Sequence, residues 1–412
     1  MRLLFVGQEA QPTGMARVTR AIASELSKFM DVGVLAVDRF CDAELNEARN
    51  SRPLNYSVFK NPYEYDLYGE KAFVKVCNEM QPSHIVIYQD LWNISRYIDA
   101  IHSINCKPHI IAYCPVDGEF NDLSLLTGLG CLDALVTTSM FSKKQLAGCN
   151  GILGCNSDIH VIPHGIAVSD FQVAGSTVDR AAYRKLLFPE RPDIWQSPIL
   201  LNGNRHQSRK RLKDTLLGFS LFCKSSSSSA CLYLHWGHEN SGDNLKQIAS
   251  DLGITDRVLF RSDSSFEDAS SISKVYNACD IGINTSLGEG WGLVSFEHAA
   301  TGAPQIVPSH SACLDQWEGY AVFLDRLEGL KLNRYCGGQK TSHKQISSVI
   351  KLLVDDTEAY RHFSQKSIEQ VNRPLYRWSI IAEQWHALLY SLNQQRELLS
   401  ENTLGGTSSL IN

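Results

Sequence analysis

The sequence lacks any long apolar run. Its first apolar stretch covers only residues 3–6 and leads directly into polar residues, so it is too short for the apolar core of a signal peptide. No later stretch approaches the roughly 20 apolar residues that a membrane-spanning helix needs. We therefore expect a cytoplasmic protein, and a peripheral contact with a membrane surface stays open because such a contact leaves no clear mark in this sequence.

Several short motifs are absent as well. The 12 cysteines are scattered without a Cys-x-x-Cys pair, and the nearest two, Cys149 and Cys155, have no matching pair of histidines. This favours reduced thiols over a zinc site. Residues 7–14, which follow the first apolar run, contain no Gly-x-Gly-x-x-Gly, so a nicotinamide dehydrogenase is not expected.

Charge of one sign is not in large excess. The formal net charge is only -5, so stable binding of nucleic acid is not expected, although a local basic site is compatible with this charge. Hydrophobic residues make up 43% and charged residues 20%, which is typical of a globular protein. A chain of 412 residues is too long for one ordinary core, and we expect two domains.

The first half of the chain alternates apolar runs with helical patterns. The helical pattern over residues 15–28 places Val18, Ile22 and Leu26 on one face. The apolar runs are continuous, as in strands that are buried on both faces of a parallel sheet. They cover residues 3–6, 32–37, 84–88, 109–113, 134–138 and 160–162. This alternation predicts a doubly wound α/β domain.

A second series of the same kind follows a polar connection over residues 168–197, which contains one short predicted helix. Its predicted strands cover residues 199–201, 231–235, 258–260, 280–284 and 305–307. We expect an N-terminal domain over 1–175, onto which a C-terminal helix over 376–396 packs back. A second domain over 191–375 and a flexible tail over 397–412 complete the expected organisation. Ligands should bind at the carboxyl ends of the strands.

The most informative segment covers residues 284–297. A buried strand ends near its first residue, a glycine-rich turn follows, and a helix is predicted over residues 291–301. Gly288, Gly290 and Gly292 permit close approach of the backbone and positive φ. The N–H groups at the start of the helix would form an anion site. For the glycines alone, a strand-to-helix turn without a ligand is the alternative.

Two acidic side chains flank this turn. Glu289 lies within it, and Glu297 lies roughly 7 Å along the helix axis from its glycines. This spacing suits a sugar nucleotide, with the transferred sugar at Glu289, the diphosphate at the helix start and the ribose at Glu297. The residues predicted to line the donor at the helix start are Gly290, Trp291, Gly292 and Leu293.

A basic segment follows the first strand of the second series. Its four cations lie within seven residues: Arg205, Arg209, Lys210 and Arg211. Guanidinium and ammonium groups both suit phosphate oxygens, and such charge can stabilise a departing nucleotide without a metal. A solvated basic loop is the alternative, but the position in the domain of the two glutamates favours Arg205 and Lys210 as diphosphate ligands. Asn204 and Arg261 are further donor-binding candidates.

Together these motifs resemble those of the retaining GT-B glycosyltransferases of the glycosyl transferases group 1 family. The resemblance rests on Glu-x7-Glu from Glu289 to Glu297 and on Arg-x4-Lys from Arg205 to Lys210, with further matches at residues 162–165, 276–280 and 302–304. It implies two Rossmann-like doubly wound domains that face a central cleft, with the acceptor on the side of the N-terminal domain and the nucleotide-sugar donor on the C-terminal domain. In that family the first glutamate lies at the donor sugar, the second binds the ribose hydroxyls, and the Arg/Lys pair holds the diphosphate.

The resemblance also implies the chemistry. We expect a retaining, metal-independent transfer of a sugar from a nucleotide-diphosphate donor, with UDP- or GDP-sugars favoured and no cofactor. The absence of any Asp-x-Asp triplet, the usual metal-bridging motif of the other large class, agrees with this. The acceptor is not identified; a glycan, a lipid or a small molecule is favoured. A sugar-nucleotide epimerase and an inactive sugar-nucleotide-binding module are the alternatives.

The N-terminal half carries fewer signals. Residues 11–15 resemble the family's glycine-containing loop, which makes Gly14 a second candidate anion contact, with a plain helix N-cap as the alternative. Many family members carry a histidine after the fourth N-domain strand, where residues 113–118 of this chain place Asp117. We include Asp117 among the catalytic candidates as an acceptor-side or sugar-side contact, although a turn-forming Asp-Gly explains it equally well.

Overall fold

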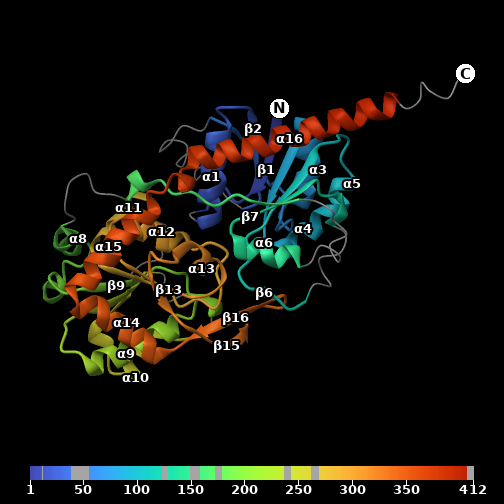
Figure 1. The fold of residues 1–412 in the computed structure, drawn as a ribbon. Helices are drawn as coiled ribbons and strands as arrows, with labels where there is room; N and C mark the ends of the chain where they lie inside the picture. The colour runs from blue at the N-terminus through green and yellow to red at the C-terminus, as the bar shows by residue number, and fades with distance from the viewer. Residues whose placement is uncertain are drawn as a thin grey trace, which may run out of the picture.

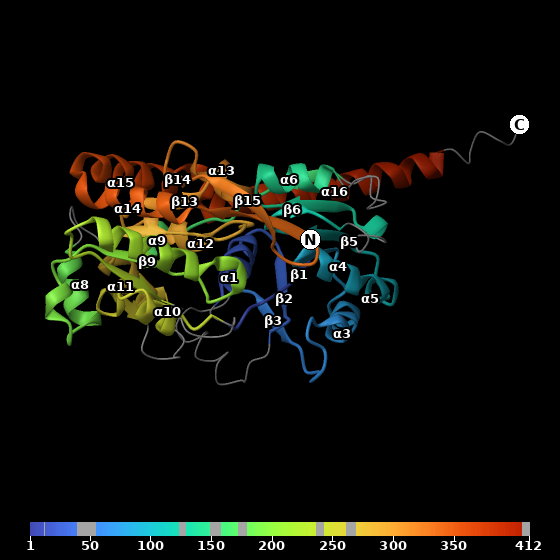
Figure 2. The same ribbon diagram turned by 90° about the horizontal axis from the view of Figure 1, so that it is seen from below.

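The structure, a computed structural model, describes residues 1–11, 13–38, 55–122, 129–148, 158–171, 179–235, 243–260 and 269–405. It contains two α/β domains that lie side by side, with the C-terminal helix extending from the second domain across the first (Figures 1 and 2). None of the helices in these ranges is long and apolar enough to cross a membrane.

The N-terminal domain is built on a parallel sheet of order β3-β2-β1-β4-β5-β7-β8. Its strands are β1 (Arg2–Gly7), β2 (Asp31–Ala36), β3 (Ser57–Lys60), β4 (His84–Tyr88), β5 (His109–Tyr113), β7 (Ala134–Thr137) and β8 (Ile159–Val161). Six of these follow the predicted apolar runs, and β3 was missed because it is an edge strand with only partly buried side chains. The strand order reverses between β1 and β4, which is where doubly wound sheets bind ligands.

Helices cover both faces of this sheet, as continuous apolar strands require. They are α1 (Gly14–Leu26), α3 (Glu70–Met80), α4 (Leu91–Ile94), α5 (Ile98–His102) and α6 (Met140–Ala147). Helix α1 buries Val18, Ile22 and Leu26, as its pattern predicted. It begins directly after the loop that follows β1, and it lies on the side of the sheet next to the second domain (Figure 2).

The C-terminal domain repeats the plan with a parallel sheet of order β11-β10-β9-β12-β13-β14. Its strands are β9 (Ile199–Asn202), β10 (Cys231–Leu234), β11 (Val258–Phe260), β12 (Ile281–Ile283), β13 (Gln305–Pro308) and β14 (Val322–Leu324). Its helices are α9 (Leu212–Ser225), α10 (Leu245–Asp251), α11 (Ala269–Ala278), α12 (Leu293–Ala299), α13 (Ser311–Trp317), α14 (His343–Asp355) and α15 (Thr357–Val371). The strand order reverses between β9 and β12, the two strands after which the basic and glycine-rich segments were found.

A third, antiparallel sheet joins the domains and was not predicted. The hairpin β15 (Arg326–Lys331) and β16 (Cys336–Thr341) belongs to the second domain, and β16 pairs with β6 (Glu119–Phe120) of the first. Beside it, the rings of Trp92 and Tyr335 stack with centroids 5.1 Å apart. The hairpin is mostly polar and glycine-rich, so it lacks the apolar runs by which the other strands were recognised.

Helix α16 (Trp378–Gly405) packs back onto the N-terminal domain. Trp385 is fully buried and meets the ring of Tyr113 at 5.0 Å between centroids. A side chain at Gly165 would place its Cβ 2.5 Å from the Trp378 ring, so this glycine permits the close approach at which the helix begins. The helix runs beyond Arg396 into the segment expected to be a flexible tail, and Arg396 itself is held by the carbonyls of residues 107 and 108.

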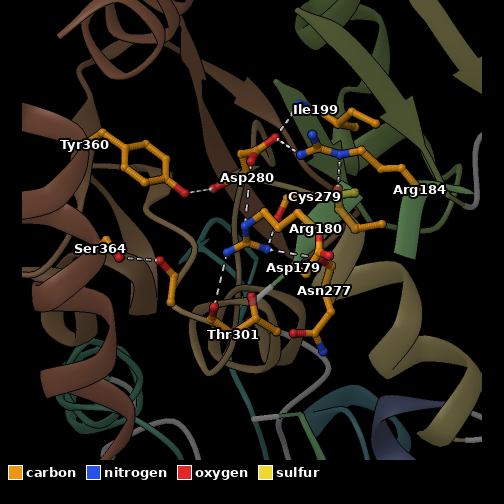
Figure 3. Close-up of polar contacts among 12 residues, drawn as sticks. Asp179, Arg180, Arg184, Ile199, Asn277, Cys279, Asp280, Thr301, Tyr360 and Ser364 are labelled. Atoms are coloured by element: carbon orange, nitrogen blue, oxygen red, sulfur yellow. Dashed lines mark hydrogen bonds and ion pairs between the residues drawn. The ribbon is translucent and has the colours of Figure 1, made fainter. Parts of the chain in front are cut away.

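The predicted connection between the domains is anchored to the second domain by helix α8 (Arg180–Leu187), as Figure 3 shows. Arg184 and Arg180 both pair with the Asp280 carboxylate, Arg180 at 3.6 Å. Arg180 also donates to the carbonyls of Cys279 and Thr301, at 2.5 and 3.1 Å. Two guanidinium groups thus converge on one carboxylate just before the interior strand β12, and they anchor the connection between the domains to the second domain.

Replacing Asp280 by alanine should destabilise the C-terminal domain by about 3–5 kcal/mol, because it leaves two largely buried guanidinium groups without their carboxylate. Urea unfolding followed by intrinsic fluorescence measures the change. Asp193→Ala is the matched control, since its pair with Arg191 is exposed and should matter little. Equal unfolding midpoints for the two variants would contradict a structural role of the Asp280 cluster.

Candidate functional site

The glycine-rich turn between β12 and α12 lies directly against a loop of the other domain. A Cβ on Gly288 would lie 2.1 Å from the carbonyl oxygen of Asp117, and one on Gly290 would lie 2.7 Å from Cβ of Pro115. Neither position therefore tolerates a side chain. The close approach predicted for these glycines is confirmed, and within the structure it is made by the backbone that follows β5.

Helix α12 begins later than expected. Gly292 has φ +95° and caps the helix, so the helical residues are 293–299 instead of 291–301. Trp291 lies before the cap, and its ring packs against Phe296 and His164, at 5.0 and 5.3 Å between centroids. The indole of Trp291 is thus part of the core, and only its backbone could fulfil the predicted donor contact. Leu293 is partly buried at the first helical position.

Glu289 is buried and held by several donors of its own domain. One carboxylate oxygen is bound by the Lys210 ammonium and accepts from Ser286 Oγ at 2.9 Å and Asn284 Nδ2 at 3.2 Å. Arg209 lies 3.8 Å from the other oxygen. Burial alone would raise the pKa of Glu289, but Lys210 and Arg209 lower it to about 2, so the group is a carboxylate at neutral pH.

Asp117 forms the contact between the two domains at this point. Its carboxylate accepts from the Gly290 N–H at 2.7 Å and pairs with Arg209 at 3.3 Å. The Gly290 N–H was expected to be free for a donor phosphate; in the structure it is occupied, because the loop after β5 brings a carboxylate to it. Asp117 therefore lies beside the glycine-rich turn, and its role toward a sugar or an acceptor stays a prediction.

The cations of the basic segment differ in their burial and in their partners. Lys210 is turned toward Glu289 and is buried, whereas Arg205 is exposed and has no ion-pair partner among the described residues. Asn204 is buried in the turn after β9, where its Nδ2 donates to Asn202 at 3.0 Å. Arg205 thus remains available to a diphosphate, while Lys210 would reach one only beside Glu289. Arg261 lies outside the described residues.

Glu297 is buried on the second turn of α12 and is reached from the N-terminal domain. Arg17 of helix α1 lies 2.5 Å from one carboxylate oxygen, between Nη1 and Oε1. The hydroxyl of Tyr276 on α11 donates to the other oxygen at 2.9 Å. Burial raises the pKa of Glu297, and Arg17 is the strongest opposing influence.

The first turn of α1, in the N-terminal domain, faces the start of helix α12 in the C-terminal domain. Thr13 is its N-cap and accepts from Ala16 N at 3.1 Å. The helix N-cap given above as the alternative interpretation of residues 11–15 is therefore present. A Cβ on Gly14 would lie 3.1 Å from Leu293 Cδ1, which places Gly14 against the start of α12. Its contact with an anion stays a prediction.

A cavity of about 290 Å³ opens at the carboxyl ends of β1, β2 and β4 in the N-terminal domain. Its lining residues are Gln8, Gln11, Val37, Asp38, Leu67, Tyr68 and Gln89. Asp90 follows Gln89 in the sequence. Among the residues that the structure describes, its carboxyl group has no hydrogen-bond partner. Burial and the nearby Asp117 raise the pKa of Asp90 to about 7, against a smaller opposite influence of Arg209.

Histidines and metal ligands add little to this site. His164 is buried between aromatic rings, and burial lowers its pKa to about 3, which is typical of a structural histidine. Within the described ranges, no group of three or more His, Cys, Asp or Glu side chains is arranged to hold a metal ion.

Three residues of the site were not selected from the sequence. Arg209 belongs to the basic segment, but nothing in the order of the residues showed that it, and not Arg205, contacts Asp117. Asp90 follows strand β4, and its place at a carboxyl strand end was a usable signal. Arg17 carried no signal, because its partner Glu297 is 280 residues away in the sequence and belongs to the other domain.

Comparisons with known proteins agree with this architecture. HepE from Anabaena in complex with UDP-glucose is similar with a TM-score of 0.69 at 16% identity, over 95% of this chain and all of that one. Sucrose-phosphate synthase from Thermosynechococcus elongatus is similar with a TM-score of 0.70 at 14% identity, over 96% of this chain and 100% of that one. A glycosyltransferase from Rickettsia africae is similar with a TM-score of 0.68 at 15% identity, over 95% of this chain and 98% of that one. A search of curated proteins finds no significant match.

At such identities, similarity to solved structures establishes the fold alone, which is GT-B: two α/β domains with parallel sheets. The sequence of the C-terminal domain shows a similarity to one family. Residues 189–370, which include Glu289, Glu297 and the basic segment, match the model described as "Glycosyl transferases group 1". The C-terminal domain is therefore similar to the glycosyl transferases group 1 family, over a match that spans less than half of the chain.

Proposed function

We propose that this glycosyltransferase moves a sugar from a nucleoside-diphosphate donor to a hydroxyl-bearing acceptor, with retention of configuration and without a metal ion. The observation that carries the proposal is the pair of buried carboxylates, Glu289 and Glu297, at the two ends of one turn-and-helix unit. Each is paired with a cation, and the exposed Arg205 lies on the loop that supplies Lys210. Such an arrangement suits a ligand with hydroxyl groups at both ends and a negative charge between them.

The donor is assigned to this unit by its chemistry. The hydroxyls of the transferred sugar would donate to Glu289, and those of the ribose to Glu297, because a carboxylate has about four acceptor sites and each has some still free. The diphosphate would lie near Arg205, Arg209 and the start of α12. UDP- and GDP-sugars are the proposed donors; HepE, a similar fold, is described in complex with UDP and glucose.

The proposed reaction needs little acid–base chemistry from the protein. The bond between the anomeric carbon and the phosphate oxygen breaks, and the acceptor oxygen forms its bond on the same face. The acceptor proton passes to the departing phosphate oxygen. Arginine side chains aimed at the diphosphate would stabilise the charge that develops there. Glu289, a carboxylate with a pKa of about 2, can orient the sugar and stabilise positive charge at the anomeric carbon, but it has no proton to donate.

The acceptor is proposed to enter the cavity at the ends of β1, β2 and β4. Gln8, Gln11 and Gln89 line it, and amide side chains can both donate to and accept from hydroxyl groups. Asp90 follows the lining residue Gln89, and Asp117 is near enough to raise the pKa of Asp90. These groups favour a hydroxyl-rich acceptor, such as a glycan or a small polar molecule.

Incubation with a panel of UDP- and GDP-sugars should release the nucleoside diphosphate with at least one donor, and excess EDTA should leave the rate unchanged. The anomeric proton of the product, followed by NMR, should show the configuration of the donor. Tight nucleotide binding without turnover of any donor would favour an inactive binding module. An inverted product, or a rate abolished by EDTA and restored by a divalent cation, would contradict the proposed mechanism.

The two carboxylates should respond differently to substitution. Glu297→Gln should weaken binding of the free nucleoside diphosphate about tenfold or more, because a charged hydrogen-bond acceptor for the ribose is lost. Glu289→Gln should instead lower kcat by about 100-fold with little effect on that affinity, because the sugar contact is lost. Calorimetry and steady-state kinetics separate the two effects.

The control for both variants is Glu318→Gln, which changes an exposed glutamate on the same domain. This variant should match the parent both in its affinity for the nucleoside diphosphate and in kcat. If Glu289→Gln and Glu297→Gln also behaved like the parent, the assignment of the donor site to this turn and helix would be wrong.

A further inference from the structure

In the Arg17–Glu297 pair, a side chain of the N-terminal domain directly contacts a buried carboxylate of the C-terminal domain. Glu297 is 4% exposed, and its two oxygens are divided between domains: Oε1 faces Arg17 of α1, and Oε2 accepts from Tyr276 of α11. A buried carboxylate that loses its cation is left uncompensated at a large cost. The state of Glu297 therefore depends on a residue of the opposite domain.

The placement of Arg17 is set by the start of its helix. Thr13 caps α1, and Arg17 N donates to its carbonyl at 3.0 Å, so Arg17 lies at the end of the first helical turn. This turn is the one that carries Gly14 against Leu293 of the donor helix. The Arg17 side chain is 26% exposed, yet its Nε is buried and has no hydrogen-bond partner within the described ranges.

These observations, taken with the proposed function, point to the ribose. We propose that Arg17 is a positioning residue for the donor: it holds the Glu297 carboxylate in place for the ribose hydroxyls, so that the ribose site is complete only when the two domains meet. The unpartnered Nε gives Arg17 a further donor group at the same place, which a nucleotide oxygen can accept.

The electrostatic surroundings of Glu297 explain why a cation is needed. Three elements bring titratable groups to it: Arg17 on α1, Tyr276 on α11 and Asp170 on the 3-10 helix Val168–Asp170. Burial raises the pKa of Glu297, and Asp170 raises it further. Arg17 and the Tyr276 hydrogen bond act in the opposite direction. Arg17 is the only cation among these groups, so its loss would move the pKa of Glu297 further upward.

Loss of Arg17 should make the nucleotide affinity depend on pH, because it raises the pKa of Glu297. A protonated Glu297 is a weaker acceptor for ribose hydroxyls than the carboxylate. Without Arg17, nucleotide affinity should therefore fall as the pH is lowered through the raised pKa, whereas the parent should change less over the same range. A residue that merely supported the fold would lower affinity equally at every pH.

The test is calorimetric titration with UDP-glucose and with GDP-glucose between about pH 6 and pH 8, a range in which the diphosphate diester of these probes does not titrate. Arg17→Ala should bind the probe at least about tenfold more weakly than the parent and more weakly still at the acidic end. Arg17→Lys retains a cation and should recover part of the affinity, with a pH profile as flat as that of the parent.

The matched control is Arg20→Ala, which removes the same side chain from the next turn of α1, where Arg20 bonds the carbonyl of Glu9 within its own domain. It should bind like the parent. The inference is overturned if Arg17→Ala binds like this control, or if its loss is the same at every pH and is not reduced in Arg17→Lys.

Failure of the proposed function gives a different result. If the parent bound neither sugar nucleotide, the donor class and the inference that rests on it would both be wrong. If the parent bound one of them and Glu297→Gln weakened it while Arg17→Ala did not, the ribose assignment would stand and the role of Arg17 alone would be rejected.

Discussion

The site depends on one steric constraint: the backbone after β5 must lie against the glycine turn after β12. Gly288 and Gly290 permit distances to Asp117 and Pro115 that no other residue would allow. Once the two segments are this close, the Asp117 carboxylate reaches the Gly290 N–H and Arg209. The hairpin β15–β16 then pairs with β6 immediately after this loop. One backbone approach thus sets the relative position of the domains around the donor residues.

Burial of charge imposes the second constraint. Two glutamates lie within eight positions of each other and both are almost inaccessible to solvent. Such groups are stable only when paired and hydrogen-bonded, since burial of an unpaired charge costs several kcal/mol. The chain meets this requirement in two ways. Glu289 is satisfied within its own domain by Lys210, Ser286 and Asn284. Glu297 obtains its cation from Arg17 of the other domain.

Much of this could be predicted from the sequence, because continuous apolar runs mark strands buried on both faces and because the donor motifs are local. The structure does bring Lys210 to Glu289 of the turn at residues 284–292, whereas the predicted contact of Lys210 with a diphosphate stays a prediction. What escaped prediction depends on tertiary contact. The β15–β16 hairpin has no apolar pattern, Arg17 is distant from Glu297 in the chain, and the Gly290 N–H is taken by a carboxylate from the other domain. Local patterns specify elements, whereas the partners across the domain interface are set by packing.

Glu289 has its partners in one domain and Glu297 has them in two, and this difference affects how a donor would be recognised. The groups around Glu289 come from β12, its turn and the loop after β9, so they stay together whatever the position of the N-terminal domain. The groups around Glu297 come from both domains and stay together only while α1 lies against α12. The proposed sugar end of the site is therefore preorganised, and the proposed ribose end is coupled to domain contact. For the proposed transfer this division would be useful, because the domain contact that completes the surroundings of Glu297 also brings Asp117 to Arg209, beside Glu289.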